Sequence, residues 1–157
     1  MKKTLIILLM IPIIGFGQDV EYGDDYVLKG TTVLKWSSKY RQTYYQYGYY
    51  LAELKSSACD NGGKRQEELE DEVTTASQSD STITISISKV GNCSDAFLGE
   101  IEIVNDSIIN LVTHEYGGRS TCICCFGLDF IIKTEGLNKE IRYTMIDGNR
   151  ATLIEIE

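Results

Sequence analysis

Apolar side chains recur at every other position through the second half of the chain, and this alternation restricts the possible folds more than any other feature. Ile83, Ile85 and Ile87 alternate with Thr and Ser, and Ile101 and Ile103 alternate with Glu. Successive side chains of a β-strand point to opposite faces of its sheet, so this period indicates half-buried strands. Two more strands are indicated by the same spacing of Phe126, Leu128, Phe130 and Ile132, and of Ile141, Tyr143 and Met145.

Short polar segments separate these strands. Asn105-Asp106 precedes the apolar run from Ile108 to Val112, and Asp147-Gly148-Asn149 precedes the run from Leu153 to Ile156. Asn, Asp and Gly accept the positive φ angles of tight hairpin turns. The sequence therefore predicts antiparallel strands joined by hairpins after Ser81.

The first half is less regular. Residues 25–36 alternate as a strand does, and Lys64 to Ser77 carries a narrow apolar stripe among charged neighbours, which indicates a surface helix. The segment from Ser37 to Ser57 fits both patterns, because one set of its large residues has helical spacing while another set alternates. The helical set is Tyr40, Tyr44, Tyr47, Leu51 and Leu54, and the alternating set is Tyr45, Tyr47, Tyr49 and Leu51.

With helices grouped early and strands late, we expect an α+β fold in which one or two N-terminal helices pack against an antiparallel meandering sheet. If the Tyr-rich segment is instead a strand, the alternative is an all-β sandwich or barrel. The polar segment Ser77 to Ser81 is interpreted as a loop within one domain, because neither half of the chain is large enough to form a stable domain alone.

The amino terminus has the three parts of a secretory signal. Lys2 and Lys3 are followed by an uncharged apolar run over 5–16, which ends in small residues at Gly15 and Gly17. A membrane-spanning helix needs about 20 apolar residues, and this run is shorter and contains Pro12. We therefore expect residues 1–17 to be a cleaved signal peptide and residues 18–157 to form a single exported domain, periplasmic or secreted, without stable membrane insertion.

The charge of the chain excludes one class of partner. Removing Lys2 and Lys3 from the 15 basic residues leaves 13 against 23 acidic residues, a net charge of −10. Nucleic acid affinity comes largely from Lys and Arg that neutralise phosphates, and the sequence has no basic stripe. We expect no nucleic acid partner, and the acidity is interpreted as a source of solubility.

Five cysteines follow the signal: Cys59, Cys93, Cys122, Cys124 and Cys125. In an exported protein this number indicates two disulfides and one free thiol. Residues two apart in a strand have parallel Cβ vectors and adjacent residues face opposite ways, so the last three cysteines need partners elsewhere. We expect Cys93 to pair with Cys122 or Cys124, and Cys59 to pair with Cys125.

Metal or thiol chemistry is the alternative use of these residues. Cys122, Cys124 and Cys125, with His114 nearby in sequence, offer ligands for a soft ion. The C-x-C-C spacing lacks the C-x-x-C knuckle of structural zinc sites and of redox motifs. We therefore expect neither a metal nor a cofactor.

Catalytic motifs are few, because His114 is the one histidine of the chain. A two-histidine zinc motif is excluded, and neither a G-x-S-x-G elbow nor a phosphate-binding loop is present. A secreted hydrolase that uses His114 or acidic residues stays open as an alternative, since 23 acids offer many carboxylate pairs.

Tyrosines crowd the segment before Leu51. Tyrosine is favoured at binding surfaces because it is large, stiff and amphipathic. The competing interpretation is that part of the cluster packs a helix onto the sheet. The candidate binding residues are Tyr40, Tyr44, Tyr45, Tyr47, Tyr49 and Tyr50.

The cysteine-rich strand resembles a pattern in small uncharacterised exported bacterial proteins. The likeness covers Cys59 to Lys133 and rests on Asn92-Cys93, the strand Gly99 to Glu102, and the C-x-C-C-F-x-L motif from Cys122 to Leu128. It implies a bacterial envelope location and carries over no catalytic residue. We therefore expect a non-enzymatic binding or inhibitory module that recognises another envelope or extracellular protein.

Overall fold

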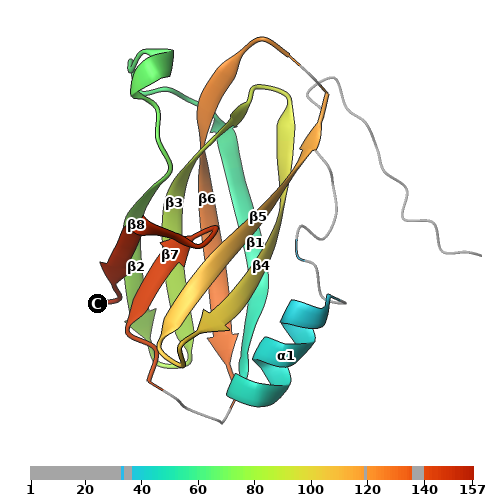
Figure 1. The fold of residues 1–157 in the computed structure, drawn as a ribbon, viewed down its shortest axis with the longest axis vertical. Coiled ribbons are helices and arrows are strands. Elements are labelled where there is room, and N and C mark those ends of the chain that lie inside the picture. The colour runs from blue at the N-terminus through green and yellow to red at the C-terminus, as the bar shows by residue number, and fades with distance from the viewer. Residues whose placement is uncertain (1–32, 34–36, 119, 136–139) are drawn as a thin grey trace, which may run out of the picture.

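The structure, a computed structural model, is built almost entirely of β-strands. It describes residue 33 and residues 37–118, 120–135 and 140–157, so the predicted signal peptide and nearly all of the strand predicted over 25–36 lie outside the described residues. Two four-stranded sheets stack face to face, with a helix at one end (Figure 1). The prediction of an α+β fold with helices covering one sheet is wrong, and the arrangement is that of the all-β sandwich alternative.

The first sheet has the strand order β1-β6-β3-β2, and all of its neighbouring strands are antiparallel. The central pair, β6 and β3, is in register over eleven consecutive residue pairs. The strands are β1 (Tyr49–Cys59), β2 (Glu72–Ser79), β3 (Thr82–Asn92) and β6 (Ile123–Thr134).

The second sheet has the order β4-β5-β7-β8. Its β5–β7 pair is parallel, because the chain leaves this sheet after β5, runs through β6 in the first sheet and then returns. The strands are β4 (Asp95–Val104), β5 (Ile108–Gly117), β7 (Tyr143–Ile146) and β8 (Asn149–Glu155).

The Tyr-rich segment contains a helix and a strand in succession. Helix α1 (Ser38–Tyr47) ends at Gly48, whose φ of 74° places it in the left-handed region where a residue without Cβ is favoured. Strand β1 begins at the next residue. The helical spacing therefore describes the part of the segment before Gly48, and the alternating spacing describes the part after it.

The helix predicted over Lys64 to Ser77 is wrong. This segment forms a short 3-10 turn, η1 (Gln66–Glu68), followed by β2. Val73 and Ala76 both face the core although they are three residues apart, because the β2–β3 register shifts between Val73 and Thr75. A β-bulge thus reproduces the three-residue spacing of a helical face.

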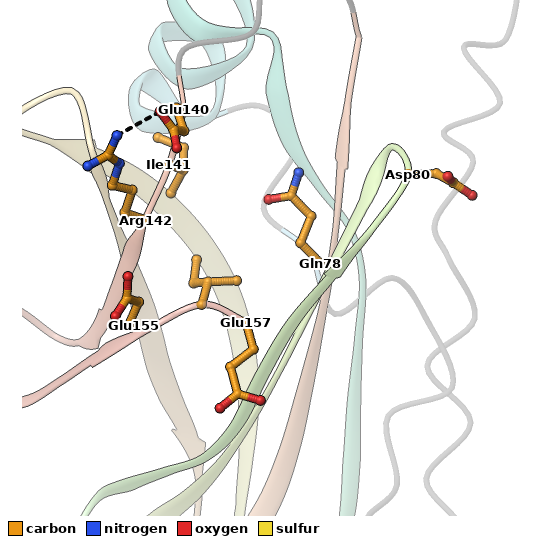
Figure 2. Close-up of a pocket in the computed structure, with 8 residues that line it drawn as sticks. Gln78, Asp80, Glu140, Ile141, Arg142, Glu155 and Glu157 are labelled. Carbon is orange, nitrogen blue, oxygen red and sulfur yellow. Dashed lines mark hydrogen bonds and ion pairs between the residues drawn. The ribbon is translucent and has the colours of Figure 1, made fainter.

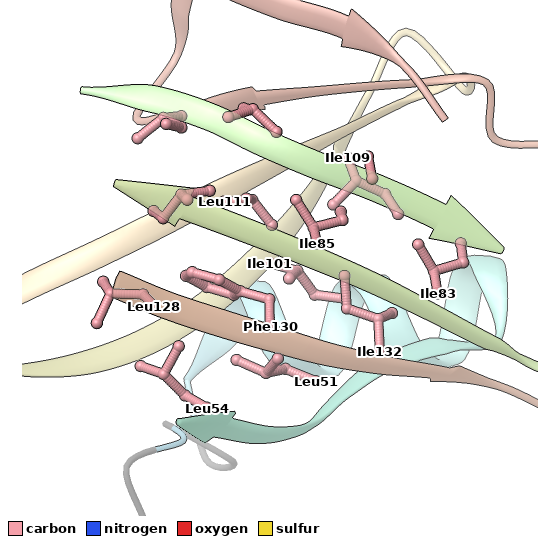
Figure 3. Close-up of a cluster of buried hydrophobic side chains, with 14 of the residues drawn as sticks. Leu51, Leu54, Ile83, Ile85, Ile101, Ile109, Leu111, Leu128, Phe130 and Ile132 are labelled. Carbon is pink, nitrogen blue, oxygen red and sulfur yellow. The ribbon is translucent and has the colours of Figure 1, made fainter. Parts of the chain in front are cut away.

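The core lies between the two sheets (Figure 3). Ile83, Ile85 and Ile87 of β3 lie opposite Ile132, Phe130 and Leu128 of β6, so the alternating residues of both strands share one face. The second sheet contributes side chains to the same layer. These inward side chains, together with Ile101, Ile109 and Leu111, are at most 1% exposed.

Lys89 continues the inward series of β3 and is 8% exposed. Its Nζ lies 2.7 Å from Asp71 Oδ2, before β2, and 3.1 Å from Asp147 Oδ2, in the β7–β8 turn. Asp147 also accepts hydrogen bonds from the Thr113 amide and hydroxyl on β5. This ion-pair network therefore joins the first sheet to the second beyond the end of the apolar core.

Two opposing effects act on the Lys89 ammonium. Burial lowers its pKa, but hydrogen bonds and charge attraction from Asp71 and Asp147 outweigh burial and hold the pKa above the ordinary value of 10.5. A raised pKa in the folded state means that the stabilisation is complete below the unfolded-state pKa and is lost as the pH rises through the folded-state pKa.

We expect Lys89→Met to lower the free energy of unfolding by about 1–3 kcal/mol near pH 7, because it leaves two carboxylates without their buried partner. The difference from the unsubstituted protein should stay constant up to about pH 10 and shrink above it. Urea unfolding at a series of pH values measures this difference. The exposed Lys133→Met serves as the control, and an equal effect of both substitutions would contradict a special role for Lys89.

Candidate functional site

The cysteines form a cluster at the end of β1 that is remote from α1. Cys59 bonds to Cys124, and Cys93 bonds to Cys122, with Cα–Cα distances of 5.8 and 5.4 Å. Cys59 ends β1, Cys93 lies in the connection between β3 and β4, and the other two lie at the start of β6. The expected pairing of Cys93 with Cys122 or Cys124 is confirmed for Cys122.

The expected pairing of Cys59 with Cys125 is wrong. A register shift between Ser56 and Cys59 places Cys59 opposite Phe126, on the inward face of β6 that Cys124 also occupies. Cys124 is 1% exposed, whereas Cys125 is half-buried on the other face and has a free thiol. This β-bulge, which cannot be recognised in the sequence, therefore decides the partner of Cys59.

The two disulfides touch each other. The Sγ atoms of Cys59 and Cys93, which belong to different bridges, lie 3.9 Å apart, and with Cys124 Sγ they all fall within 4.8 Å of one another. The structure does not bring together the ligand set suggested by the sequence, because Cys125 faces away from Cys124 and His114 bonds elsewhere. The cluster that forms instead consists of the four disulfide-bonded cysteines, which come from three segments of the chain.

The candidate binding tyrosines divide into a buried pair and an exposed group. Tyr47 and Tyr49 belong to the core, and burial raises the pKa of Tyr49 although a hydrogen bond with Thr134 lowers it. Tyr44, Tyr45 and Tyr50 remain at the surface, where they form a tyrosine patch. The side chain of Tyr40 lies outside the described residues.

The tyrosine patch is held together by edge-on ring contacts and by Glu135. The ring of Tyr44 lies 5.2 Å from that of Tyr45 and 5.8 Å from that of Tyr50, between centroids. The hydroxyls of Tyr44 and Tyr50 donate to the two carboxylate oxygens of Glu135, at 2.9 and 3.3 Å. Tyr45 is 74% exposed. The patch therefore presents one ring to solvent beside two rings whose hydroxyls are held by Glu135.

His114 makes a hydrogen bond with a buried carboxylate. Its Nε2 lies 2.8 Å from Oε2 of Glu100, which is 5% exposed, and the other oxygen of Glu100 has no hydrogen-bond partner. A carboxylate that orients a histidine is one part of a hydrolytic site. Within the described residues, no hydrogen bond joins His114 to the side chain of a Ser, Thr or Cys.

An open, polar cleft of about 570 Å³ lies between the β2–β3 hairpin and the ends of β7 and β8 (Figure 2). Four of its side chains are acidic, and Arg142, its cation, pairs with Glu140 at 2.9 Å and lowers the pKa of that carboxyl. None of these residues was predicted from the sequence to belong to a site, because only the fold places residue 78 beside residues 140–157. The lining residues are Gln78, Asp80, Glu140, Ile141, Arg142, Glu155, Ile156 and Glu157.

The loops closed by the two disulfides lead to a stability prediction. The chain-entropy estimate is about 4.3 kcal/mol for the separation of 65 residues between Cys59 and Cys124, and about 3.6 kcal/mol for the separation of 29 between Cys93 and Cys122. We expect the double variant Cys59→Ala/Cys124→Ala to lose more stability than Cys93→Ala/Cys122→Ala in urea unfolding. Cys125→Ala is the control and should change the unfolding free energy by about 1 kcal/mol or less. The reverse order of the two double variants would show that loop size does not decide their effects.

The chain matches no protein-family model, no curated protein and no solved structure. The resemblance to small exported bacterial proteins therefore stays an expectation from the sequence.

Proposed function

We propose that this chain is an exported binding module, held together by disulfides, that recognises another envelope or extracellular protein through its tyrosine patch. The observation that carries the proposal is Tyr45, an aromatic side chain that is 74% exposed and packs against Tyr44, which in turn contacts Tyr50. Aromatic residues of this kind supply most of the energy at many protein interfaces.

Preorganisation supports the choice of this surface. The Glu135 carboxylate holds the hydroxyls of both Tyr44 and Tyr50, and the Glu135 amide donates to the Gly48 carbonyl at 2.7 Å. Side chains that are already ordered lose little entropy when a partner binds, so more of the contact energy appears as affinity. The same carboxylate makes the patch amphipathic, which suits a partner that combines apolar and hydrogen-bonding groups.

The second part of the proposal is that the protein is located outside the cytoplasm. Disulfides persist in oxidising compartments, and both bridges of the structure are compatible with a location outside the cytoplasm. None of the helices in the described residues is long and apolar enough to cross a membrane. Together with the signal-like residues 1–17, these features favour export followed by cleavage.

The export proposal predicts a defined mature product. When the whole chain is expressed in a bacterial host, its mass in the periplasmic fraction should correspond to a start at Gln18, after cleavage at Gly17. Alkylation without reduction should modify one thiol, that of Cys125. A cytoplasmic product of full length, or one with five reactive thiols, would rule out this part of the proposal.

The tyrosine patch is tested by Tyr45→Ala, a change that removes an exposed ring and should leave the fold intact. Proteins captured from the native envelope by the unsubstituted chain are purified, and their Kd values are measured against both forms. Truncation of an aromatic residue on which an interface depends costs about 2 kcal/mol or more, so we expect the Kd to rise about 30-fold.

The matched control is Leu153→Ala, which removes an exposed apolar side chain from β8 in the other sheet. It should leave the Kd unchanged. If Tyr45→Ala binds every captured protein as tightly as the unsubstituted chain does, the tyrosine patch is not the contact surface.

A further inference from the structure

We propose that the two adjacent disulfides form a thiol–disulfide exchange site that accepts electrons from an external dithiol at the Cys93–Cys122 bridge and passes them to the Cys59–Cys124 bridge. This activity goes beyond the proposed binding function and does not depend on it. It follows from the position of Cys93, whose Sγ lies 3.9 Å from Cys59 Sγ of the other bridge. That separation is close to van der Waals contact, so the thiolate of Cys93, once released, has a disulfide within reach.

The proposed exchange begins at Cys122. Cys122 and Cys59 are both exposed, Cys93 is half-buried and Cys124 is buried in the core, so an incoming thiolate reaches one sulfur of each bridge, and attack on Cys122 is the event that releases Cys93. Attack on a disulfide sulfur passes through a mixed disulfide and expels the other sulfur as a thiolate. One thiolate of the dithiol therefore bonds to Cys122 and releases Cys93, after which its second thiol displaces Cys122. The dithiol leaves as a disulfide, and Cys122 takes up a proton.

The second step takes place within the chain. The Cys93 thiolate attacks Cys59 Sγ, the bond between Cys59 and Cys124 breaks as the bond between Cys59 and Cys93 forms, and Cys124 leaves as a thiolate that takes up a proton. One dithiol has been oxidised and one of the two disulfides has been reduced. The product carries a Cys59–Cys93 bridge and a C-x-C dithiol at Cys122 and Cys124.

Two structural features favour transfer between the bridges over a purely structural role for both. The connection between β3 and β4 places Cys93, which is bonded to Cys122, beside Cys59 of the other bridge, and the register shift in β1 turns Cys59 toward Cys124. Cys125, the free thiol, lies on the opposite face of β6 from Cys124, so it does not take part in the exchange.

The test compares two variants that lose the same bridge. Both carry Cys125→Ser; one also carries Cys122→Ser, which leaves the Cys93 thiol beside Cys59, and the other carries Cys93→Ser, which leaves the Cys122 thiol instead. The folded variants are held near pH 8.5, where a free thiol is about half ionised, then quenched in acid and mapped by mass spectrometry without reduction. Circular dichroism and the same incubation in guanidinium chloride show whether exchange needs the folded state.

In the Cys122→Ser variant we expect Cys59–Cys93 and Cys59–Cys124 peptides in amounts within about tenfold of each other, because the two bonds are of one chemical type. The folded Cys93→Ser variant should retain Cys59–Cys124 alone. The proposal is overturned if the Cys122→Ser variant also retains only Cys59–Cys124, or if both variants exchange equally in the folded state.

A second measurement uses the chain with all four bridge cysteines. The Cys125→Ser protein is treated with limiting dithiothreitol, and the new thiols are alkylated and located in the species that has lost one disulfide. If electrons pass between the bridges, label should appear on Cys122 and Cys124, with Cys59 and Cys93 bonded together, in an amount within about tenfold of the species labelled on Cys93 and Cys122. Label on Cys93 and Cys122 alone, with Cys59–Cys124 intact, would show reduction of the Cys93–Cys122 bridge without transfer and would overturn the proposal.

Discussion

Apolar contact between the inner faces of the two sheets is the interaction on which the rest of the structure depends. Ile85 and Phe130 lie opposite each other in the centre of the first sheet, and Ile109 and Leu111 face them from the second. Burial of such side chains is worth about 1.5–3 kcal/mol each, and the layer contains many of them. Lys89, the disulfides and α1 are each placed at the rim of this layer, where they close its ends.

β-Bulges decide what the rim residues do. In β2 a register shift brings Val73 and Ala76 to the same face, and in β1 successive shifts bring Leu51 and Leu54 inward and turn Cys59 toward Cys124. Each bulge adds one residue and reverses the face of every residue after it. The chemistry of the cysteine cluster thus follows from a backbone irregularity and not from the spacing of cysteines.

The two candidate surfaces lie at opposite ends of β1, roughly 30 Å apart for a strand of this length. The tyrosine patch lies where β1 leaves α1, and the cysteine cluster lies where β1 ends. A partner held at the patch, as proposed, would therefore leave Cys122 open to a dithiol. The proposed binding and thiol exchange use separate surfaces, so a substitution can abolish one and leave the other intact.

The sequence by itself determined where most strands after Ser81 lie, the inward faces of β3 and β6, and the turns at Asn105 and Asp147, because period-two burial and positive-φ turn residues are local properties. The antiparallel pairing that it predicted is wrong for β5 and β7, which are parallel. It also determined that Cys93 pairs with the start of β6. Tertiary structure alone decided that Lys64 to Ser77 contains a strand, that Cys59 pairs with Cys124, that Tyr47 and Tyr49 are core while Tyr45 is exposed, and that an acidic cleft forms beside Gln78. These outcomes depend on strand register and on contacts between residues far apart in the chain. A bulge in β1 or β2 gives apolar residues the spacing of a helical face, and only the pairing with the neighbouring strand shows that the segment is a strand.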